Sequence, residues 1–329
     1  MRRVPHPALP HARILSKRGI KVKRYIIKRI LISAFTLTVI ILIMFLLMEL
    51  MPGTPFNDEK LSEDQIAVLY RKYGLDKPVL YRFWKYLTNT LKGDFGVSYT
   101  LAKNMSIRDL LAKRFPVSIH IAVLSMIMGT ISGILLGTLA AVFHNSILDP
   151  IVSVISMIGN SVPSYVFALG LMYYVGYKAG WLPILYDANS EFLSILMPCI
   201  ALSMTSMASI ARFTRTQMID VLGSDYILLA ESKGSSRARV IRKHALRNSL
   251  IPLMTIIAPM LVSLMLGSTI TESMFSIPGI GSLMIQAIQV NDYNVVISLA
   301  FIYSAMYIGV MLLVDILYGI VDPRIRVAG

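Results

Sequence analysis

The chain has 329 residues, of which 55% are hydrophobic and only 15% are charged, and its mean hydropathy is positive. This composition excludes an ordinary soluble domain and is typical of an integral membrane protein. The formal net charge is +14, but the basic residues interrupt segments too apolar to lie in water, which excludes a nucleic-acid-binding surface. The single cysteine, Cys199, excludes a disulfide framework and a thiolate metal site.

Residues 1–29 form a basic tail that contains ten lysines and arginines. The apolar run that follows is too long for a secretion signal, and no small-residue cleavage site comes after it, so it predicts a retained membrane anchor. Eight more basic residues lie between Arg212 and Arg247. The two short loops that would lie on the opposite side of the membrane contain only one basic residue, Lys178. This asymmetry predicts that both termini face the cytoplasm.

Six apolar segments are long enough to cross a hydrocarbon core of about 30 Å, which takes about 20 helical residues. Their apolar residues are continuous rather than alternating, so they predict helices and not membrane-spanning strands. We therefore predict an all-α integral membrane fold of six transmembrane helices. Pro163, Pro198, Pro252 and Pro259 lie within or at the ends of the spans, where each can bend its helix. The predicted spans lie near residues 30–50, 117–142, 151–175, 192–211, 250–271 and 295–320.

The first two spans are separated by a long loop, residues 52–116, with eleven basic and seven acidic residues. A loop of this length escapes the charge rule, so the parity of the spans places it outside the cytoplasm. Residues 75–96 predict a helix with Asp76 as N-cap, Pro78 in the first turn and Gly93 just past its end. Its apolar stripe is typical of a helix at the membrane interface, or equally of a cap packed on the outer ends of the spans. The stripe consists of Leu80, Phe83, Trp84, Leu87 and Leu91.

Three acidic residues lie within or near the predicted spans, namely Glu49, Glu272 and Asp315. Charged residues in hydrocarbon are costly, so all three are candidates for a functional role. Structural roles are favoured, because Glu49 and Glu272 fall at span ends where they can reach water, and Asp315 can pair with a donor on a neighbouring helix. His120 in the second span is expected to be a packed or pathway-facing histidine, because no second metal ligand lies near it in the sequence.

Between the fourth and fifth spans, residues 225–231 and 235–248 predict two short helices. Gly234 lies between them, where a positive φ lets the chain turn sharply. The second helix carries an apolar face and a basic face, which suit both anionic lipid and an acidic protein groove, and the residues alone do not decide between these. A basic cytoplasmic loop with no further role is the remaining alternative.

The same segment, "AESKG" followed by "HALRNSLIP", resembles the cytoplasmic loop of the permease subunits of ABC importers, in the version of the peptide-transporting branch. The general pattern of that loop is E-A-A, three residues, G, nine residues, I-x-L-P. Ala230, Gly234 and Leu246 match it. The sequence departs from it at Leu228, Leu229, His244 and Arg247.

Other stretches extend the resemblance to the oligopeptide and dipeptide permease family, first-permease type, over residues 24–326. They are "LMPGTPF", "YGLDKP", "GDFGVS", "ESMFSIPGIG" and "VDILYGIVDPRIR". The resemblance implies the transmembrane-domain fold of type I ABC importers. The permease domain would cover residues 30–329, including the extracytoplasmic loop 52–116 and a cytoplasmic coupling loop, 212–249.

In this family the cytoplasmic loop is a coupling helix that seats in a groove of the ATP-binding subunit. The resemblance implies that ATP and Mg²⁺ are held by partner subunits, with no cofactor in this chain. The chain itself lacks a Walker A loop and the motifs of membrane hydrolases, so we do not expect an enzyme. The residues implied in ATPase coupling are Tyr226, Ala230, Glu231, Lys233, Gly234, Arg239, Arg242, His244 and Arg247.

The resemblance also implies a second, related permease subunit in a heterodimer, two ATP-binding subunits and an external substrate-binding protein, all at the bacterial cytoplasmic membrane. The implied substrate is an oligopeptide or a dipeptide, and nickel complexes or glutathione are alternatives within the same branch. Candidate translocation contacts lie on the third and fifth spans and on a short helix predicted at 282–288, which is equally expected as a packed re-entrant turn. They are Asn160, Ser161, Ser164, Ser268, Thr269, Glu272 and Gln286.

Two other functions are less consistent with the sequence. A secondary transporter driven by protons through Glu272 or Asp315 predicts inverted repeats with matching broken helices, and the sequence shows no such symmetry. A membrane-embedded enzyme requires a catalytic constellation that the spans lack. The preferred hypothesis is therefore an importer permease.

Overall fold

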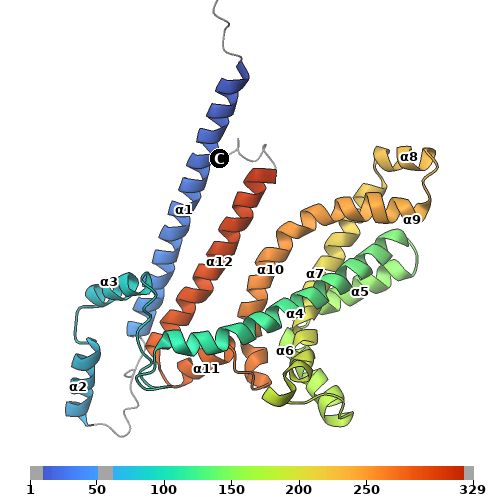
Figure 1. Cartoon of the computed structure of the whole chain (residues 1–329). Helices are drawn as coiled ribbons and strands as arrows, with labels where there is room; N and C mark the ends of the chain where they lie inside the picture. The colour runs from blue at the N-terminus through green and yellow to red at the C-terminus, as the bar shows by residue number, and fades with distance from the viewer. Residues whose placement is uncertain (1–9, 51–61, 322–329) are drawn as a thin grey trace, which may run out of the picture.

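The computed structural model describes residues 10–50 and 62–321 of the chain (Figure 1). Its regular structure in these ranges is helical, apart from an isolated β-bridge between Val97 and Ser106. The predicted all-α fold is confirmed. In chain order the helices are α1 (Pro10–Leu50), α2 (Glu63–Tyr73), α3 (Val79–Thr90), α4 (Ile107–Val142), α5 (Leu148–Ser161), α6 (Ser164–Leu171), the π-helical η2 (Met172–Lys178), the 3₁₀-helical η3 (Ala188–Ser190), α7 (Glu191–Leu222), α8 (Asp225–Ser232), α9 (Arg237–Arg239), the π-helical η4 (Val240–Leu246), α10 (Arg247–Met274), α11 (Ile280–Gln289) and α12 (Tyr293–Val321).

The described helices supply four candidate membrane crossings, or up to six if each of two bent pairs forms one crossing. The four are α1 from Ile26 onward, α4, α7 and α12, which are long and apolar enough to cross alone. The two bent pairs are α5 with α6 and η2, and α9 and η4 with α10. In Figure 1, α8 lies at the same end of the molecule as the start of α1 and the end of α12, while α3 and α11 lie at the opposite end. Elements that are separated by an odd number of predicted spans thus lie at opposite ends of the molecule, which agrees with the six predicted spans.

Prolines mark both bends. The third span turns through 99° between α5 and α6, at Val162 and Pro163. The fifth span turns through 61° between Arg237–Leu250 and Thr255–Leu266, and Pro252 lies in the break. Proline has no N–H group for the helical hydrogen-bond ladder and clashes with the preceding turn, so a bend at these points is expected. The predicted bends at Pro163 and Pro252 are confirmed, whereas the helices continue through Pro198 of α7 and Pro259 of α10.

The tightest helix contact joins α4 to α7. Gly129, Gly133 and Gly137 recur every fourth residue along α4 and face α7. A Cβ atom at Gly133 would come within 2.8 Å of the side chain of Ile210 and of the backbone oxygen of Met207. Small residues let helix backbones approach closely in a membrane, where dispersion forces rather than water exclusion hold helices together. The two helices therefore form the inner scaffold of the bundle.

On the outer side, α3 packs across α1 and α12. Phe83 and Leu87 are buried with Ile41 of α1 and Ile297 of α12. The other three predicted stripe residues, Leu80, Trp84 and Leu91, are exposed, so two of the five stripe residues pack as a cap. The predicted cap is confirmed for this part of the stripe, and contact of the exposed part with the membrane interface stays a prediction.

The predicted N-cap of α3 is wrong. The helix begins at Val79, with Pro78 as its N-cap. Asp76 is excluded from that position because a proline disfavours the helical conformation of the residue before it, here Lys77.

Asp292 anchors the outer loop to the start of α12. Its carboxylate is buried and accepts hydrogen bonds from the Ser98 hydroxyl at 2.5 Å and from the backbone N–H groups of Thr100 and Leu101 at 3.0 Å each. Burial, and next the neighbouring Asp292 carboxylate, raises the pKa of Tyr99 to about 12, so the phenol stays neutral. Asp292 has no local sequence signal for this role, because its donors come from residues far away in the chain.

Two helices extend beyond the predicted spans. α1 begins at Pro10, so much of the predicted N-terminal tail is helical. α4 begins at Ile107 and includes Pro116, so the last ten residues of the predicted loop 52–116 are helical. A proline within a transmembrane helix is tolerated where neighbouring groups compensate for the lost hydrogen bond. Residues 51–61 and 322–329, which the predicted outer loop and C-terminal tail include, lie outside the described residues.

We predict that Gly133→Ala destabilises the protein in detergent by about 1–3 kcal/mol, because the added methyl group overpacks the contact between α4 and α7. The thermal unfolding midpoint of the purified protein measures this effect. The matched control is Gly170→Ala in α6, where a Cβ atom would meet no atom of another described segment within 4 Å. Alanine is the better helix former, so the control should be neutral or slightly stabilising. Equal midpoints for both variants would contradict the close packing.

Candidate functional site

A helical elbow projects from the end of the bundle where α1 starts and α12 ends, which is the predicted inner end (Figure 1). α8 ends at Ser232, and Gly234 follows with φ of +80°, a left-handed conformation that favours glycine. The N–H group of Gly234 donates to the oxygen of Glu231 at 2.8 Å, and that of Ser235 donates to the oxygen of Ala230 at 3.1 Å. These bonds satisfy carbonyl groups at the helix end, as in a Schellman-type C-cap. The predicted turn at Gly234 is confirmed.

The second arm of the elbow differs from the prediction. Residues 235–248 do not form a separate helix, because α9 leads into η4, and η4 leads directly into α10. Neither glycine nor proline interrupts the chain between Gly234 and Pro252, so helical hydrogen bonding continues from the elbow into the span. The second arm of the elbow, which consists of α9 and η4 and is called the basic arm below, is therefore one end of the fifth span. Its π-helical segment, Val240–Leu246, has a geometry that is rare in proteins and frequent at functional sites.

The outward face of α8 is apolar. Ile227 is only 2% exposed and anchors the helix, whereas Leu228 and Leu229 are 58% and 55% exposed, and Tyr226 beside them is also exposed. Large apolar side chains grouped on a surface outside the spans are typical of a protein contact. Sequence reasoning treated Leu228 and Leu229 only as departures from the loop pattern. Their exposure, which depends on the fold, makes them part of the candidate contact surface.

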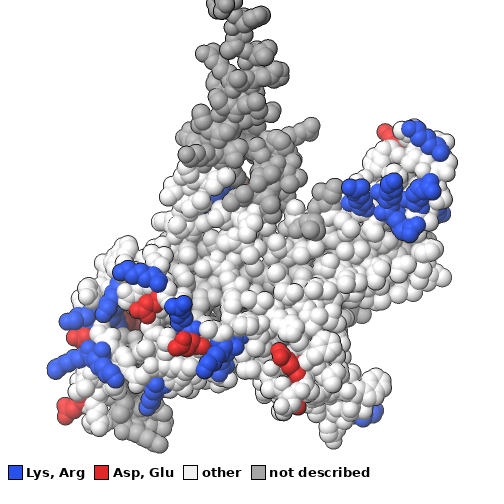
Figure 2. All heavy atoms as spheres, in the orientation of Figure 1, with Lys and Arg blue, Asp and Glu red and all other residues white. Residues whose placement is uncertain are grey.

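The predicted coupling residues gather at this end of the molecule, where Figure 2 shows basic side chains clustered over the α8–α9 region. Ala230 and His244 are half-buried and the other predicted coupling residues are exposed. The Tyr226 hydroxyl accepts a hydrogen bond from the Asn248 side chain at 3.2 Å, which joins α8 to the start of α10. The exposed set is Tyr226, Glu231, Lys233, Gly234, Arg239, Arg242 and Arg247.

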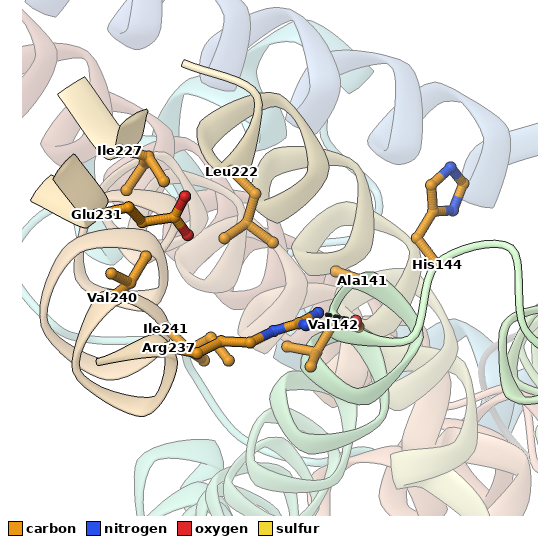
Figure 3. Close-up of a pocket in the computed structure, with 9 residues that line it drawn as sticks. All are labelled: Ala141, Val142, His144, Leu222, Ile227, Glu231, Arg237, Val240 and Ile241. Atoms are coloured by element: carbon orange, nitrogen blue, oxygen red, sulfur yellow. Dashed lines mark hydrogen bonds between the residues drawn. The ribbon is translucent and has the colours of Figure 1, made fainter. Parts of the chain in front are cut away.

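A cleft of about 340 Å³ lies behind the elbow (Figure 3). It is bounded by the ends of α4 and α7 on one side and by α8 and η4 on the other. Arg237 reaches across it and donates to the backbone oxygen of Val142 at 3.5 Å. Glu231 and His144 also line the cleft. α8 is thus held by the buried Ile227 and by the elbow, with open space between it and α4.

A polar cluster braces the base of the elbow. The Asp149 carboxylate at the start of α5 accepts hydrogen bonds from Arg215 of α7, at 2.5 Å from Nε and 2.8 Å from the terminal nitrogen. His144 Nδ1 lies 2.7 Å from the same carboxylate. Paired hydrogen bonds between a guanidinium and a carboxylate are directional as well as strong. The cluster therefore holds the turn between α4 and α5 at a set position on α7.

At the outer end of α10, Glu272 is fully buried, which contradicts the prediction that it reaches water. One carboxylate oxygen accepts from the hydroxyls of Ser118 at 2.7 Å and Ser268 at 2.9 Å. The other accepts from the backbone N–H groups of Gly281 at 2.8 Å and Ser282 at 3.1 Å. The chain folds back after α10 and places the positive end of α11 on this carboxylate, which is why burial is possible.

The other candidate translocation residues do not form one site. Asn160 accepts a hydrogen bond from Ser209 at 3.0 Å, a partner that sequence reasoning missed. Gln286 is exposed and accepts from Arg114 at 3.4 Å. The short helix predicted at 282–288 is confirmed as the slightly longer α11. Of the rest, Ser161 is exposed, Ser164 and Thr269 are half-buried, and Ser268 is buried.

The remaining polar candidates have partners within the described residues. Glu49 forms an ion pair with Arg82, and Asp315 forms one with Arg29 at 3.1 Å. The predicted pairing of Asp315 with a neighbouring helix is confirmed. His120 lies 3.7 Å from Glu191, and both side chains are about half exposed.

Up to six crossings, a braced inner elbow and an exposed apolar helix at its tip define a polytopic membrane subunit of the permease class. Comparison with known families agrees. Residues 133–327 match the family described as binding-protein-dependent transport system inner membrane component, and residues 22–122 match the N-terminal model of such membrane components. The chain belongs to this family, and the resemblance drawn from its motifs is confirmed.

Curated relatives align over almost their whole length. The dipeptide transport system permease protein DppB of Lactococcus lactis subsp. cremoris is 41% identical over 92% of this chain and 99% of its own. The oligopeptide transport system permease protein OppB of Haemophilus influenzae is 38% identical over the same shares. DppB of Bacillus subtilis is 35% identical over 92% of this chain and 98% of its own.

A solved structure has a similar fold. The MetNI methionine ABC transporter, in an inward-facing conformation, aligns with a TM-score of 0.55 at 17% identity over 65% of this chain and 96% of its own. At this identity the likeness concerns the fold alone. It agrees with the type I importer fold that the resemblance implies.

We predict that Glu272→Ala lowers the free energy of unfolding by about 3 kcal/mol, because it leaves two buried backbone donors and two hydroxyls without their acceptor. Thermal or denaturant unfolding in detergent measures the loss. Glu272→Gln is the matched control, since an amide oxygen can face Gly281 and Ser282 while both serine hydroxyls turn to accept. If the glutamine variant were as unstable as the alanine variant, hydrogen bonding would not explain the position of α11.

Proposed function

We propose that this chain is the permease subunit of an ATP-driven, binding-protein-dependent importer that passes peptides across the bacterial cytoplasmic membrane. The observation that carries the proposal is the inner elbow: an exposed apolar helix, a glycine hinge and a rigid arm continuous with a span. The substrate class is supported by the relatives, which are named as dipeptide and oligopeptide permeases and align over nearly their full lengths.

Coupling follows from the connection between the elbow and the bundle. Tyr226, Leu228 and Leu229 of α8 offer an apolar surface to a groove of an ATP-binding subunit. The arm beyond Gly234 runs without a break into α10, so a push on α8 is transmitted to the fifth span. Exposed arginines along the arm steer and orient the docking, since charges at the rim of an interface affect encounter and register more than affinity. Closure of the ATPase pair thereby changes the tilt of the spans.

The proposed complex contains this chain, a second related permease subunit, two ATP-binding subunits and an external substrate-binding protein. ATP and Mg²⁺ belong to the ATP-binding subunits, and this chain has a transport role without an enzymatic one. Both termini and the elbow face the cytoplasm in this arrangement. The proposal is supported by the basic residues of the arm, which lie at the same end of the molecule as the start of α1 (Figures 1 and 2).

A direct test uses the complete transporter in proteoliposomes with labelled peptides of graded length. ATP-dependent accumulation that also requires the external binding protein supports the proposal. Accumulation by this chain alone, driven by an ion gradient, would refute it. Copurification adds a second check, because an ATP-binding subunit is expected to accompany the chain.

We predict that Gly234→Trp leaves the assembled transporter in the membrane but uncouples ATP hydrolysis from peptide uptake by tenfold or more. The bulky residue disfavours the left-handed conformation at φ +80° by about 1–2 kcal/mol and so changes the angle of the elbow. The ratio of peptide transported to ATP hydrolysed measures coupling. Gly234→Asn is the control, because asparagine tolerates this conformation. Normal uptake in the tryptophan variant would argue against the hinge.

A further inference from the structure

The inner half of α7 carries a stripe of polar residues that the proposed function has not used. The first of the five is Thr205, and the other four follow it by four, seven, eleven and fifteen positions. At 3.6 residues per turn, they fall within an arc of about 80° on one face of the helix. Four of the five are exposed, and Ser209 is half-buried. The stripe consists of Thr205, Ser209, Arg212, Thr216 and Asp220.

The α4–α7 contact shows at what depth the stripe lies. Gly133 packs against Ile210, and Gly137 packs against Ala211 and Thr214, so the middle of the stripe is level with the inner half of α4. At that level the outward face of α4 exposes apolar side chains, including Leu135 at 59%. The bundle therefore presents two different surfaces at one depth. The apolar one suits lipid, whereas an arginine and a row of hydroxyls facing hydrocarbon would be costly.

Three of the five groups on the stripe are free to bind something else. Within the described residues, Thr205, Arg212 and Asp220 make no side-chain hydrogen bond or ion pair. Arg215, one turn along α7 from Arg212, is by contrast fully engaged with Asp149. Beside the stripe, Asn160 accepts from Ser209 through its oxygen, while its buried amide nitrogen has no partner among the described residues.

We propose that this stripe lines the water-filled inner half of the translocation pathway, and that Arg212 binds carboxylate groups of the peptide on its way to the cytoplasm. The proposal deepens, and rests on, the proposed function as a peptide importer. A guanidinium forms paired hydrogen bonds with a carboxylate, which every unmodified peptide carries at its C-terminus. Serine and threonine hydroxyls both donate and accept, so they suit the amide groups of a peptide of any sequence.

A helix of the second permease subunit is the competing occupant. Helix contacts within membranes are built mainly from small residues that allow close approach, as on the α4–α7 contact. The serine and threonines of the stripe are small residues that also occur at such contacts, but Arg212 near its middle has a long, charged side chain, which is costly where no water reaches it. Its chemistry therefore fits an aqueous pathway better than a packed helix.

Cysteine accessibility tests the lining without reference to substrate. Cys199 is the sole cysteine of the chain, so Cys199→Ala gives a cysteine-free background. Thr205→Cys and Thr216→Cys are then treated with a membrane-impermeant maleimide at the cytoplasmic face of the complete transporter in inside-out vesicles. Leu135→Cys is the control on the lipid side, because the register of the α4–α7 contact places it between the two test positions in depth. We expect the stripe positions to react at least about tenfold faster than the control, because the reactive thiolate forms in water and not in hydrocarbon.

Labelling of Thr205→Cys no faster than that of Leu135→Cys in the complete transporter would overturn the proposal. Labelling that appears only after the second permease subunit is removed would overturn it as well, because that subunit would then cover the stripe. Either result leaves peptide import itself intact, so the lining can fail while the proposed function stands.

The role of Arg212 is tested by uptake of one peptide with a free C-terminal carboxylate and with a C-terminal amide. We expect Arg212→Gln to reduce uptake of the free-carboxylate peptide about tenfold and to affect the amidated peptide much less, with Arg212→Lys between the two. Equal losses for both peptides would overturn the carboxylate contact. Failure of the unaltered transporter to import either peptide would overturn the substrate class, and with it this role of Arg212, while the labelling result still decides the lining.

Discussion

The contact between α4 and α7 is the interaction on which the rest of the structure depends. Three glycines on α4 bring its backbone against α7, so that one face of α7 is committed to packing along most of its length. α5, α6 and α10 pack around the remaining faces and leave the polar stripe open on the inner half. Because α7 leads directly to α8, the same contact also sets where the elbow leaves the bundle.

The points of possible movement are breaks in the helices, and each has a local cause. Pro163 and Pro252 interrupt hydrogen bonding inside two spans, and Gly234 allows the left-handed turn of the elbow. Between these breaks the helices are stiff, because every backbone group in a membrane must be satisfied within its own helix. Movement of α8 is therefore expected to be transmitted along the arm as far as the bend at Pro252, where the angle between the two halves of the span can change.

Much of the fold could be predicted from the sequence, because its main signals are local. Apolar run length indicated the six spans, and glycine and proline indicated the elbow and the bends. What failed depends on contacts between distant segments. The lack of glycine and proline between Gly234 and Pro252 permits a helix that joins the next span but does not require one. The short helix after Glu272 was predicted, but nothing in the sequence shows that its first N–H groups bind this carboxylate. Asp292 and the exposed face of α8 were missed for the same reason.

The roles of polar residues in the candidate site could not be predicted for the same reason. A polar residue in a span gives the same sequence signal whether it holds the fold together or faces a ligand. The structure separates the roles by counting partners. Glu272 and Asp292 are buried and receive several hydrogen bonds each, so their charge is used to hold chain segments together. Arg212 is exposed and has no partner among the described side chains, so its charge remains available to a ligand. Removing a satisfied buried charge leaves its donors unpaired and damages the fold. Removing an exposed charge that has no partner, such as that of Arg212, is instead expected to change which peptides the pathway transports.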